Sequence, residues 1–155
     1  MHMSRTIPVE LTNMIMIENS TTKEVLVEDR KNPSWPGVTF PGGHIETNET
    51  IVASVIREAY EETGLTVINP TLVGIKEWPI QDGARYIVML FKATNYQGEI
   101  HSGREGEIFW TTRDALKNMQ TPETFMEMLP VFDTLEISEL ALSASIEGRR
   151  QTTWL

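Results

Sequence analysis

The hydrophobic positions of this chain fall into short extended runs that are separated by polar turns. Residues 11–17 and 24–28 are two such runs on either side of the polar turn 19–22, which predicts two strands joined as a hairpin. Residues 85–93 are apolar almost throughout and predict a strand that is buried on both faces. Further extended segments are expected at residues 65–68, 71–78 and 107–111, with loops at 31–38 and 95–105.

Residues 50–63 show a different period. They contain no Gly or Pro, and apolar side chains recur at helical spacing. Asn48 or Thr47 is expected to cap the start of this helix, and Gly64 to end it in a left-handed conformation. One arc of the helix carries the apolar residues Val52, Val55, Ile56, Ala59 and Tyr60.

The remaining segments are predicted with less pattern to support them. Short helices are expected at residues 112–116 and 123–132. The pattern weakens from about residue 136, and residues 148–155 are expected to fray. The length fits one domain over residues 1–155, large enough to bury a core without disulfides.

Composition narrows the function classes. The chain has no cysteine, which excludes disulfides and thiolate metal sites, and its formal net charge of -9 disfavours a broad grip on nucleic acid. A small phosphorylated ligand remains compatible with that charge. No apolar run is long enough to cross a bilayer and no secretory pattern is present, so we expect a cytoplasmic protein with no membrane partner.

Glu58, Glu61 and Glu62 lie three and four positions apart, which places their carboxylates on one helix face. Such a cluster repels itself unless something positive occupies it, and ligands that are all oxygen suit Mg²⁺ or Mn²⁺. A phosphate ester would supply the remaining oxygens. The alternative for the acidic run alone is a solvated helix face.

The full spacing favours the metal site. The pattern consists of a Pro-Gly-Gly turn and fixed offsets among seven residues, namely Gly43, Glu49, Arg57, Glu58, Glu61, Glu62 and Gly64. If each residue type occurs at about 6%, such a match arises by chance on the order of once in a million. This pattern resembles the signature of the Nudix hydrolases, which cleave nucleoside diphosphates linked to another group. Ala59 departs from it, because the family usually has Ile, Leu or Val there.

The resemblance implies an α/β fold, an αβα sandwich around a mixed sheet. It also implies that the Gly43 carbonyl, Glu58, Glu61 and Glu62 hold Mg²⁺, with Mn²⁺ as a substitute. Arg57 is expected to orient these carboxylates, and Glu49 to add an outer contact.

The proton acceptor is open between two residues of a later loop. Glu105 stands where oxidised-nucleotide triphosphatases carry a further acidic residue, and Glu107 is its competitor. Either is otherwise a solvated glutamate. His44 is expected to face outward from the glycine turn and to take no part.

Three residues are candidates for contact with substrate. Arg30 closes the second predicted strand and is expected either to contact a phosphate, as in the Nudix pattern, or to be a solvated surface residue. Phe40 either faces the base or belongs to the core. Trp35 either covers the core edge, which we favour, or borders a cleft.

The leading hypothesis is a Mg²⁺-dependent pyrophosphohydrolase that converts a nucleoside triphosphate to the monophosphate and pyrophosphate. Residues 35–46 are similar to bacterial MutT-type proteins, which suggests oxidised purines such as 8-oxo-dGTP as substrates. The second hypothesis is a hydrolase of ADP-ribose or another nucleoside diphosphate derivative. The third is a non-catalytic, nucleotide-sensing Nudix module, although such modules typically lose carboxylates that are all present here. The sequence leaves the oligomeric state open, a homodimer included.

Overall fold

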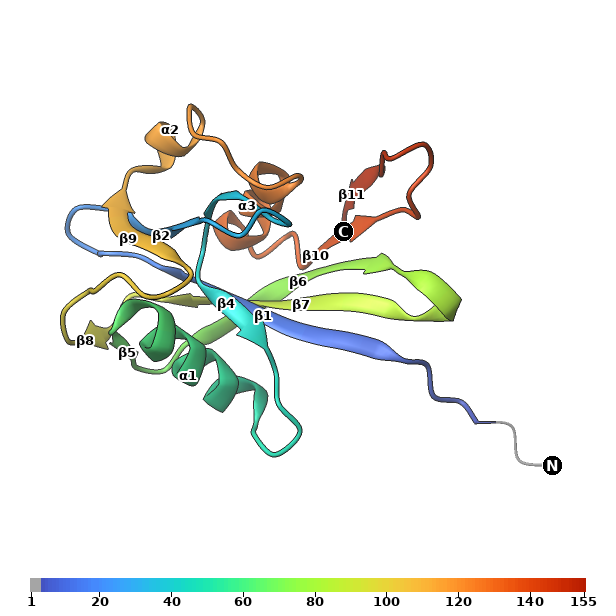
Figure 1. Cartoon of the computed structure of the whole chain (residues 1–155), viewed down its shortest axis with the longest axis horizontal. Helices are drawn as coiled ribbons and strands as arrows, with labels where there is room; N and C mark the ends of the chain where they lie inside the picture. The colour runs from blue at the N-terminus through green and yellow to red at the C-terminus, as the bar shows by residue number, and fades with distance from the viewer. Residues whose placement is uncertain (1–3) are drawn as a thin grey trace.

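A six-stranded mixed sheet forms the centre of the molecule in the computed structural model, which describes residues 4–155 (Figure 1). Residues 1–3, the start of the predicted domain, lie outside the described part. Neighbouring strands β1 and β7 run parallel, as do β6 and β10, and the other pairs are antiparallel. The order across the sheet is β11 (Thr152–Trp154), β10 (Glu139–Leu142), β6 (Thr71–Pro79), β7 (Arg85–Ala93), β1 (Val9–Ile17) and β4 (Gly42–His44).

Two smaller sheets and three helices complete the fold. The antiparallel sheet contains β3 (Gly37–Thr39), β2 (Val25–Arg30) and β9 (Gly106–Thr111), and a two-stranded ribbon contains β5 (Thr66–Val67) and β8 (Tyr96–Gln97). The helices are α1 (Ile51–Thr63), α2 (Arg113–Leu116) and α3 (Phe125–Asp133), with a 3₁₀ turn η1 at Gln81–Gly83. Among the described residues, no helix is long and apolar enough to cross a membrane.

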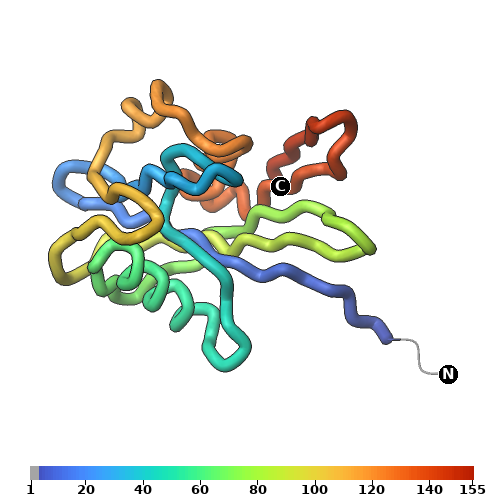
Figure 2. The backbone as a smooth tube through the Cα atoms, in the orientation of Figure 1, coloured from blue at the N-terminus to red at the C-terminus, as the bar shows by residue number. Residues whose placement is uncertain are grey.

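The layers confirm the predicted sandwich around a mixed sheet. Helix α1 covers one face of the central sheet, and α3 together with the three-stranded sheet lies over the other (Figures 1 and 2). Alternate residues of β1 divide between the layers: Ile15 and Ile17 pack with Val55 and Ala59 of α1, whereas Met16 belongs to the core on the other side. This alternation buries both faces of β1, the strand that pairs with β4 and its two glycines.

The predicted hairpin of the first two strands is wrong. β1 belongs to the central sheet and β2 to the three-stranded sheet, and a single bridge between Glu18 and Val25 joins them. The turn brings the chain back, but β2 then pairs with β9 and β3, which lets its apolar residues cover the central sheet. The predicted loop 31–38 is also shorter than expected, because Gly37–Thr39 forms β3.

Helix α1 begins at a different cap from the one expected. The Thr50 side chain accepts a hydrogen bond from the Ala53 backbone N–H at 3.0 Å, so neither Asn48 nor Thr47 is the cap. Gly64 ends the helix in the left-handed region with φ of 84°, as predicted. The apolar arc is narrower than predicted, since Val52 and Tyr60 are 44% and 58% exposed.

The end of the chain is ordered by the sheet. β11 pairs with β10, and the backbone of Leu155 exchanges hydrogen bonds with Glu139, so the expected fraying of residues 148–155 is wrong. The physical reason is that β10 runs parallel to β6 in the central sheet, so the other edge of β10 is free to pair with β11.

The first half of β7 is only half-buried, because the β6–β7 hairpin extends beyond the covering layers (Figure 1).

Candidate active site

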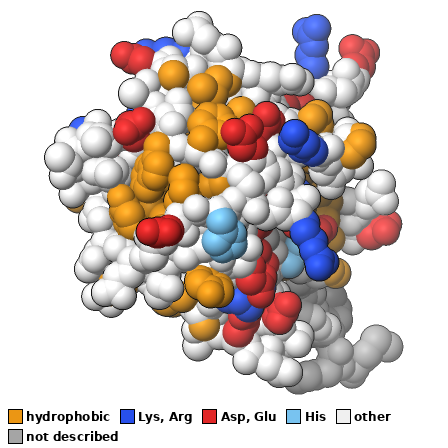
Figure 3. Space-filling model, turned by 60° about the vertical axis from the view of Figure 1, so that its left-hand side comes forward, with side chains coloured by type: hydrophobic (Ala, Val, Ile, Leu, Met, Phe, Trp, Pro, Cys, Tyr) orange, Lys and Arg blue, Asp and Glu red, His pale blue; other side chains and the backbone are white. Residues whose placement is uncertain are grey.

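Four carboxylates from three separate segments meet at the C-terminal half of α1. Glu58 and Glu62 come from the helix, Glu28 from β2 and Glu105 from the loop before β9. Carboxylate oxygens of Glu28, Glu62 and Glu105 all lie within 4.8 Å of one another. Figure 3 turns this end of the molecule forward and shows acidic side chains gathered on the lower part of that face.

Arg57 organises the outer side of this cluster. Its guanidinium donates to both carboxylate oxygens of Glu49, at 2.9 and 2.7 Å, and to Glu58 at 3.0 Å. It also reaches Glu61 at 3.2 Å and the His44 carbonyl at 3.2 Å. The hydrogen bonds from Arg57 to Glu49 are the largest cause that lowers the pKa of the Glu49 carboxyl to about 2. Arg57 therefore links the helix carboxylates to the glycine turn through its contact with the His44 carbonyl.

The glycine turn packs directly onto the carboxylates. The Gly42 N–H donates to Oε2 of Glu62 at 3.0 Å. A Cβ placed on Gly43 would lie 2.5 Å from the carboxyl carbon of Glu58, so no other residue fits there without displacing that side chain. β4 is held in place by its antiparallel pairing with β1, in which Gly43 lies opposite Asn13.

Burial and mutual repulsion raise the pKa of three carboxyls in the cluster. Burial is the largest cause for Glu28, Glu58 and Glu62. The negative charge of Glu28 raises the pKa of Glu62 further, while the hydrogen bond from Arg57 opposes the rise at Glu58. Apart from the contact between Arg57 and Glu58, burial and negative neighbours outweigh the positive charge near these carboxyls.

The donor set fits a hard divalent cation. Every side chain in the cluster offers oxygen, and the shared spacing within 4.8 Å allows Glu28, Glu62 and Glu105 to reach one ion. Glu58 lies beside them against Gly43, whose carbonyl is the backbone oxygen that the resemblance assigns to the metal. The residues present thus suit Mg²⁺ or Mn²⁺, and a cation would relieve the repulsion that raises the pKa of these carboxyls.

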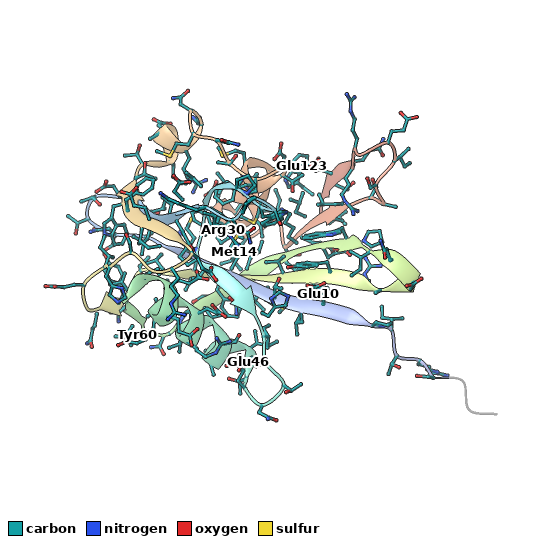
Figure 4. All side chains as sticks on the ribbon, viewed as in Figure 1. Glu10, Met14, Arg30, Glu46, Tyr60 and Glu123 are labelled. Atoms are coloured by element: carbon teal, nitrogen blue, oxygen red, sulfur yellow. The ribbon has the colours of Figure 1, made fainter. Side chains whose placement is uncertain are left out.

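One cavity of about 570 Å³ begins at the carboxylates and continues between the layers. Glu58, Glu62, Glu105 and Gly43 line one part of it. Arg30 and Met14, both labelled in Figure 4, also line the cavity. The other part is walled by the aromatic side chains of Trp35, Trp78 and Tyr86 together with Lys76 and Val88.

The residues considered for contact with substrate differ in position. Arg30 lines the cavity, and its Nε is buried with no hydrogen-bond partner in residues 4–155, which leaves it for a ligand. Trp35 is 43% exposed at the cavity rim rather than at the core edge, so the favoured interpretation is wrong.

Phe40 touches the cavity but does not offer it a free face. The ring is 1% exposed and lies at 5.0 Å from the Phe125 ring and 5.5 Å from the Phe132 ring, both in edge arrangements. Phe40 belongs to the core cluster beside α3, which favours the core position among the two alternatives.

Other predicted residues lie at the margin. The side chain of Glu61 is 57% exposed and held by Arg57, beside a second cavity that shares the carboxylates. Glu107 is exposed on β9 and lines neither cavity. His44 is exposed and bonded to Glu10 at 2.8 Å, which agrees with its predicted outward position.

The sequence did not predict Glu28, Trp78, Tyr86 and Lys76 as residues of the two cavities. Glu28 is 2% exposed at the end of the apolar run of β2. A carboxylate directly after three buried apolar residues is a signal in itself, because charged side chains are rarely buried without a function. Trp78 and Tyr86 face each other across β6 and β7, a pairing that only the register of the two strands reveals.

Comparison with known proteins agrees with this geometry. Residues 11–132 match the NUDIX domain family. Nudix hydrolase YvcI of Bacillus subtilis is 32% identical over 114 residues, which cover 70% of this chain and 69% of that protein. ADP-ribose pyrophosphatase of Methanocaldococcus jannaschii is 32% identical over 91 residues, covering 56% of this chain and 54% of that protein, about half its length.

Among solved structures, the mutator MutT protein from Bacillus halodurans superposes with a TM-score of 0.72 at 23% identity. The superposition covers 94% of this chain and 97% of that one, which shows a shared fold. The family match spans most of the chain and contains the carboxylate helix, the glycine turn and the Arg57 network. The chain therefore belongs to the Nudix hydrolases, enzymes that act on phosphoric anhydrides.

Proposed function

We propose that this enzyme hydrolyses a nucleoside triphosphate to a nucleoside monophosphate and pyrophosphate, with Mg²⁺ as its cofactor and Mn²⁺ as a substitute. The observation that carries the proposal is the single cavity that joins the carboxylate cluster to an aromatic compartment. A volume of about 570 Å³ suits one compact nucleotide, with phosphates at the acidic end and the base between flat side chains.

The roles of the residues follow from their positions. Glu28, Glu58, Glu62 and Glu105, with the Gly43 carbonyl, would hold the cation, and Glu61 supports them from the outer face. A bound divalent cation supplies positive charge that offsets the phosphate oxygens. Arg30 lines the cavity and donates to a phosphate oxygen, while Arg57 positions Glu58 without touching substrate.

Water must lose a proton as it attacks phosphorus, and we propose Glu105 as the acceptor. Its side chain is exposed and lines both cavities that meet at the cluster. The Lys31 N–H donates to the Glu105 carbonyl at 3.2 Å, which ties this loop position to the end of β2. A base must reach the proton that it takes, and Glu105 satisfies that geometry better than Glu107.

An oxidised purine such as 8-oxo-dGTP is the finer form of this proposal, and it rests on the similarity to MutT-type proteins. A second candidate is ADP-ribose, supported by the relative that bears that name. A purely sensing module is disfavoured, because its carboxylates would have no reason to converge within 4.8 Å.

The test is a side-by-side assay of dGTP, 8-oxo-dGTP and ADP-ribose with Mg²⁺, in which products are separated and identified. The expected result is a higher kcat/KM for a purine triphosphate, with pyrophosphate as product, and no turnover by Glu62→Gln. Release of orthophosphate in place of pyrophosphate, or faster cleavage of ADP-ribose, would overturn the triphosphate proposal. Absence of turnover on all three would reject both enzymatic candidates.

A further inference from the structure

Lys76 is a buried cation inside the aromatic part of the cavity. It lies on β6, is 5% exposed and lines the cavity together with Trp78, Tyr86 and Val88. The register of β6 and β7 pairs Lys76 with Val88 and Trp78 with Tyr86, so the four side chains share one face of the sheet. None of the sequence motifs, nor the chemistry of the carboxylates, uses this lysine.

The ammonium group has no partner among the described residues. Its surroundings comprise an ion–ring contact, with Nζ 5.6 Å from the centre of the Trp78 ring, and the more distant charges of Glu127 and Glu123. Both glutamates are exposed to solvent, and Glu123 is labelled in Figure 4. Burial outweighs them and lowers the pKa of Lys76 to about 8. Buried donors are usually hydrogen-bonded, so a ligand in the cavity would supply the acceptor that this ammonium lacks.

The neighbouring rings define the shape of that ligand. Trp78 and Tyr86 are stacked face to face, with ring centres 4.4 Å apart and planes within 8°, and the Lys76 Nζ lies over the Trp78 ring. A stacked aromatic pair beside an ammonium donor suits a heteroaromatic ring that carries an acceptor in its plane. Phosphates are accounted for by Arg30 and the cation site at the other end of the same cavity.

We propose that Lys76 determines base specificity by donating a hydrogen bond to a ring carbonyl oxygen, so that oxo bases are preferred over amino bases. This inference rests on the proposed function. An ammonium has three hydrogen-bond donors and no acceptor. It can therefore donate to a carbonyl oxygen, but it cannot accept from an amino group at the same position. Hypoxanthine and adenine differ at this edge, which makes their nucleotides a matched pair.

The experiment measures kcat and KM for dITP and dATP with the wild type, Lys76→Met and Lys92→Met. Lys92 lies on β7 with its charge near Glu18 at 3.9 Å, outside the cavity, and serves as the control. The wild type is expected to prefer dITP by about 10- to 100-fold, the range of a hydrogen bond to a charged group. Lys76→Met should bring the ratio close to one by raising KM for dITP, with little change in kcat, and Lys92→Met should keep the wild-type ratio.

An unchanged ratio in Lys76→Met, or an equal loss for both nucleotides, would overturn the inference and assign Lys76 a structural role. If Lys76→Met does not fold, Lys76→Gln replaces it, because an amide both donates and accepts and should also flatten the ratio. If the wild type cleaves neither triphosphate, the proposed function fails, and the inference is then judged by binding alone. Tryptophan fluorescence titrations with dIDP and dADP in EDTA should show the same preference, and equal affinities would reject it.

Discussion

Glu62 of α1 and Glu28 of β2 face each other in the interior, with carboxylate oxygens within 4.8 Å. The two residues are 8% and 2% exposed, so little water reaches them to screen the repulsion between their charges. Burial raises the pKa of both carboxyls, and the negative charge of Glu28 raises the pKa of Glu62 further. An arrangement that costs stability in the absence of a cation is the physical basis for the predictions about metal and catalysis.

Metal removal should abolish hydrolysis, because the phosphate oxygens then face the negative carboxylate cluster with no cation between them. EDTA is expected to stop turnover, and Mg²⁺ or Mn²⁺ to restore it. Mg²⁺ should also raise the Tm of the wild type, since a ligand that binds the folded state stabilises it, and raise it less for Glu62→Gln. Full activity in metal-free buffer would remove the cation from the mechanism.

Glu62→Gln and Glu61→Gln should each lower kcat by at least about 10²-fold, the order that a positioned acid–base group or charge contributes. An amide in place of the Glu62 carboxylate can still accept from the Gly42 N–H, whose hydrogen bond is 3.0 Å long, so the fold should survive. Circular dichroism and gel filtration confirm folding. A folded variant with near wild-type turnover would exclude that residue from the site.

Glu28→Gln tests the carboxylate that only the tertiary structure revealed. We expect kcat/KM to fall by at least about 10-fold at limiting Mg²⁺, with part of the loss recovered at high Mg²⁺, as is typical for residues that support a metal. Glu24→Gln is the matched control, because Glu24 precedes β2 and lines neither cavity. Equal behaviour of the two variants would show that Glu28 is buried for packing only.

Glu105→Gln should slow turnover more than Glu107→Gln. Glu105 lies within 4.8 Å of the other carboxylates, whereas Glu107 points to solvent from β9. The comparison uses kcat at saturating Mg²⁺, so that a loss of metal affinity does not imitate a loss of the base. Near wild-type rates for both variants would place the proton acceptor on α1 or β2.

Lys76→Met should increase the free energy of unfolding at pH 7 by about 1–3 kcal/mol. Burial lowers the pKa of Lys76 from 10.5 to about 8, so below pH 8 the folded state carries the full cost of the buried charge. As pH rises from 8 towards 10.5, the folded state loses this proton first and the cost disappears. The advantage of the methionine variant should therefore shrink over that window in urea unfolding. A constant difference across pH would contradict the buried charge.

Local features of the chain were predictable from the sequence. The helix over residues 51–63, its end at Gly64 and the strand Arg85–Ala93 follow from periodicity and from the conformational freedom of glycine. The offsets from Gly43 to Glu62 placed the carboxylates on one helix face, because a helix repeats every 3.6 residues whatever surrounds it. The predicted sandwich came from the family resemblance that these same residues carry.

The remainder depended on contacts between segments that are distant in the chain. Whether β2 pairs with β1 or with β9 is decided by which sheet gains cover for its apolar face, and local patterns do not contain that choice. Phe40 lies in the core rather than under a base because α3 packs against it. Glu28 and Lys76 do not stand out in the local sequence of their strands. The register and layering of separate elements bring Glu28 to one cavity and Lys76 to the other. The burial of each side chain and the charges around it are therefore set only by the tertiary structure.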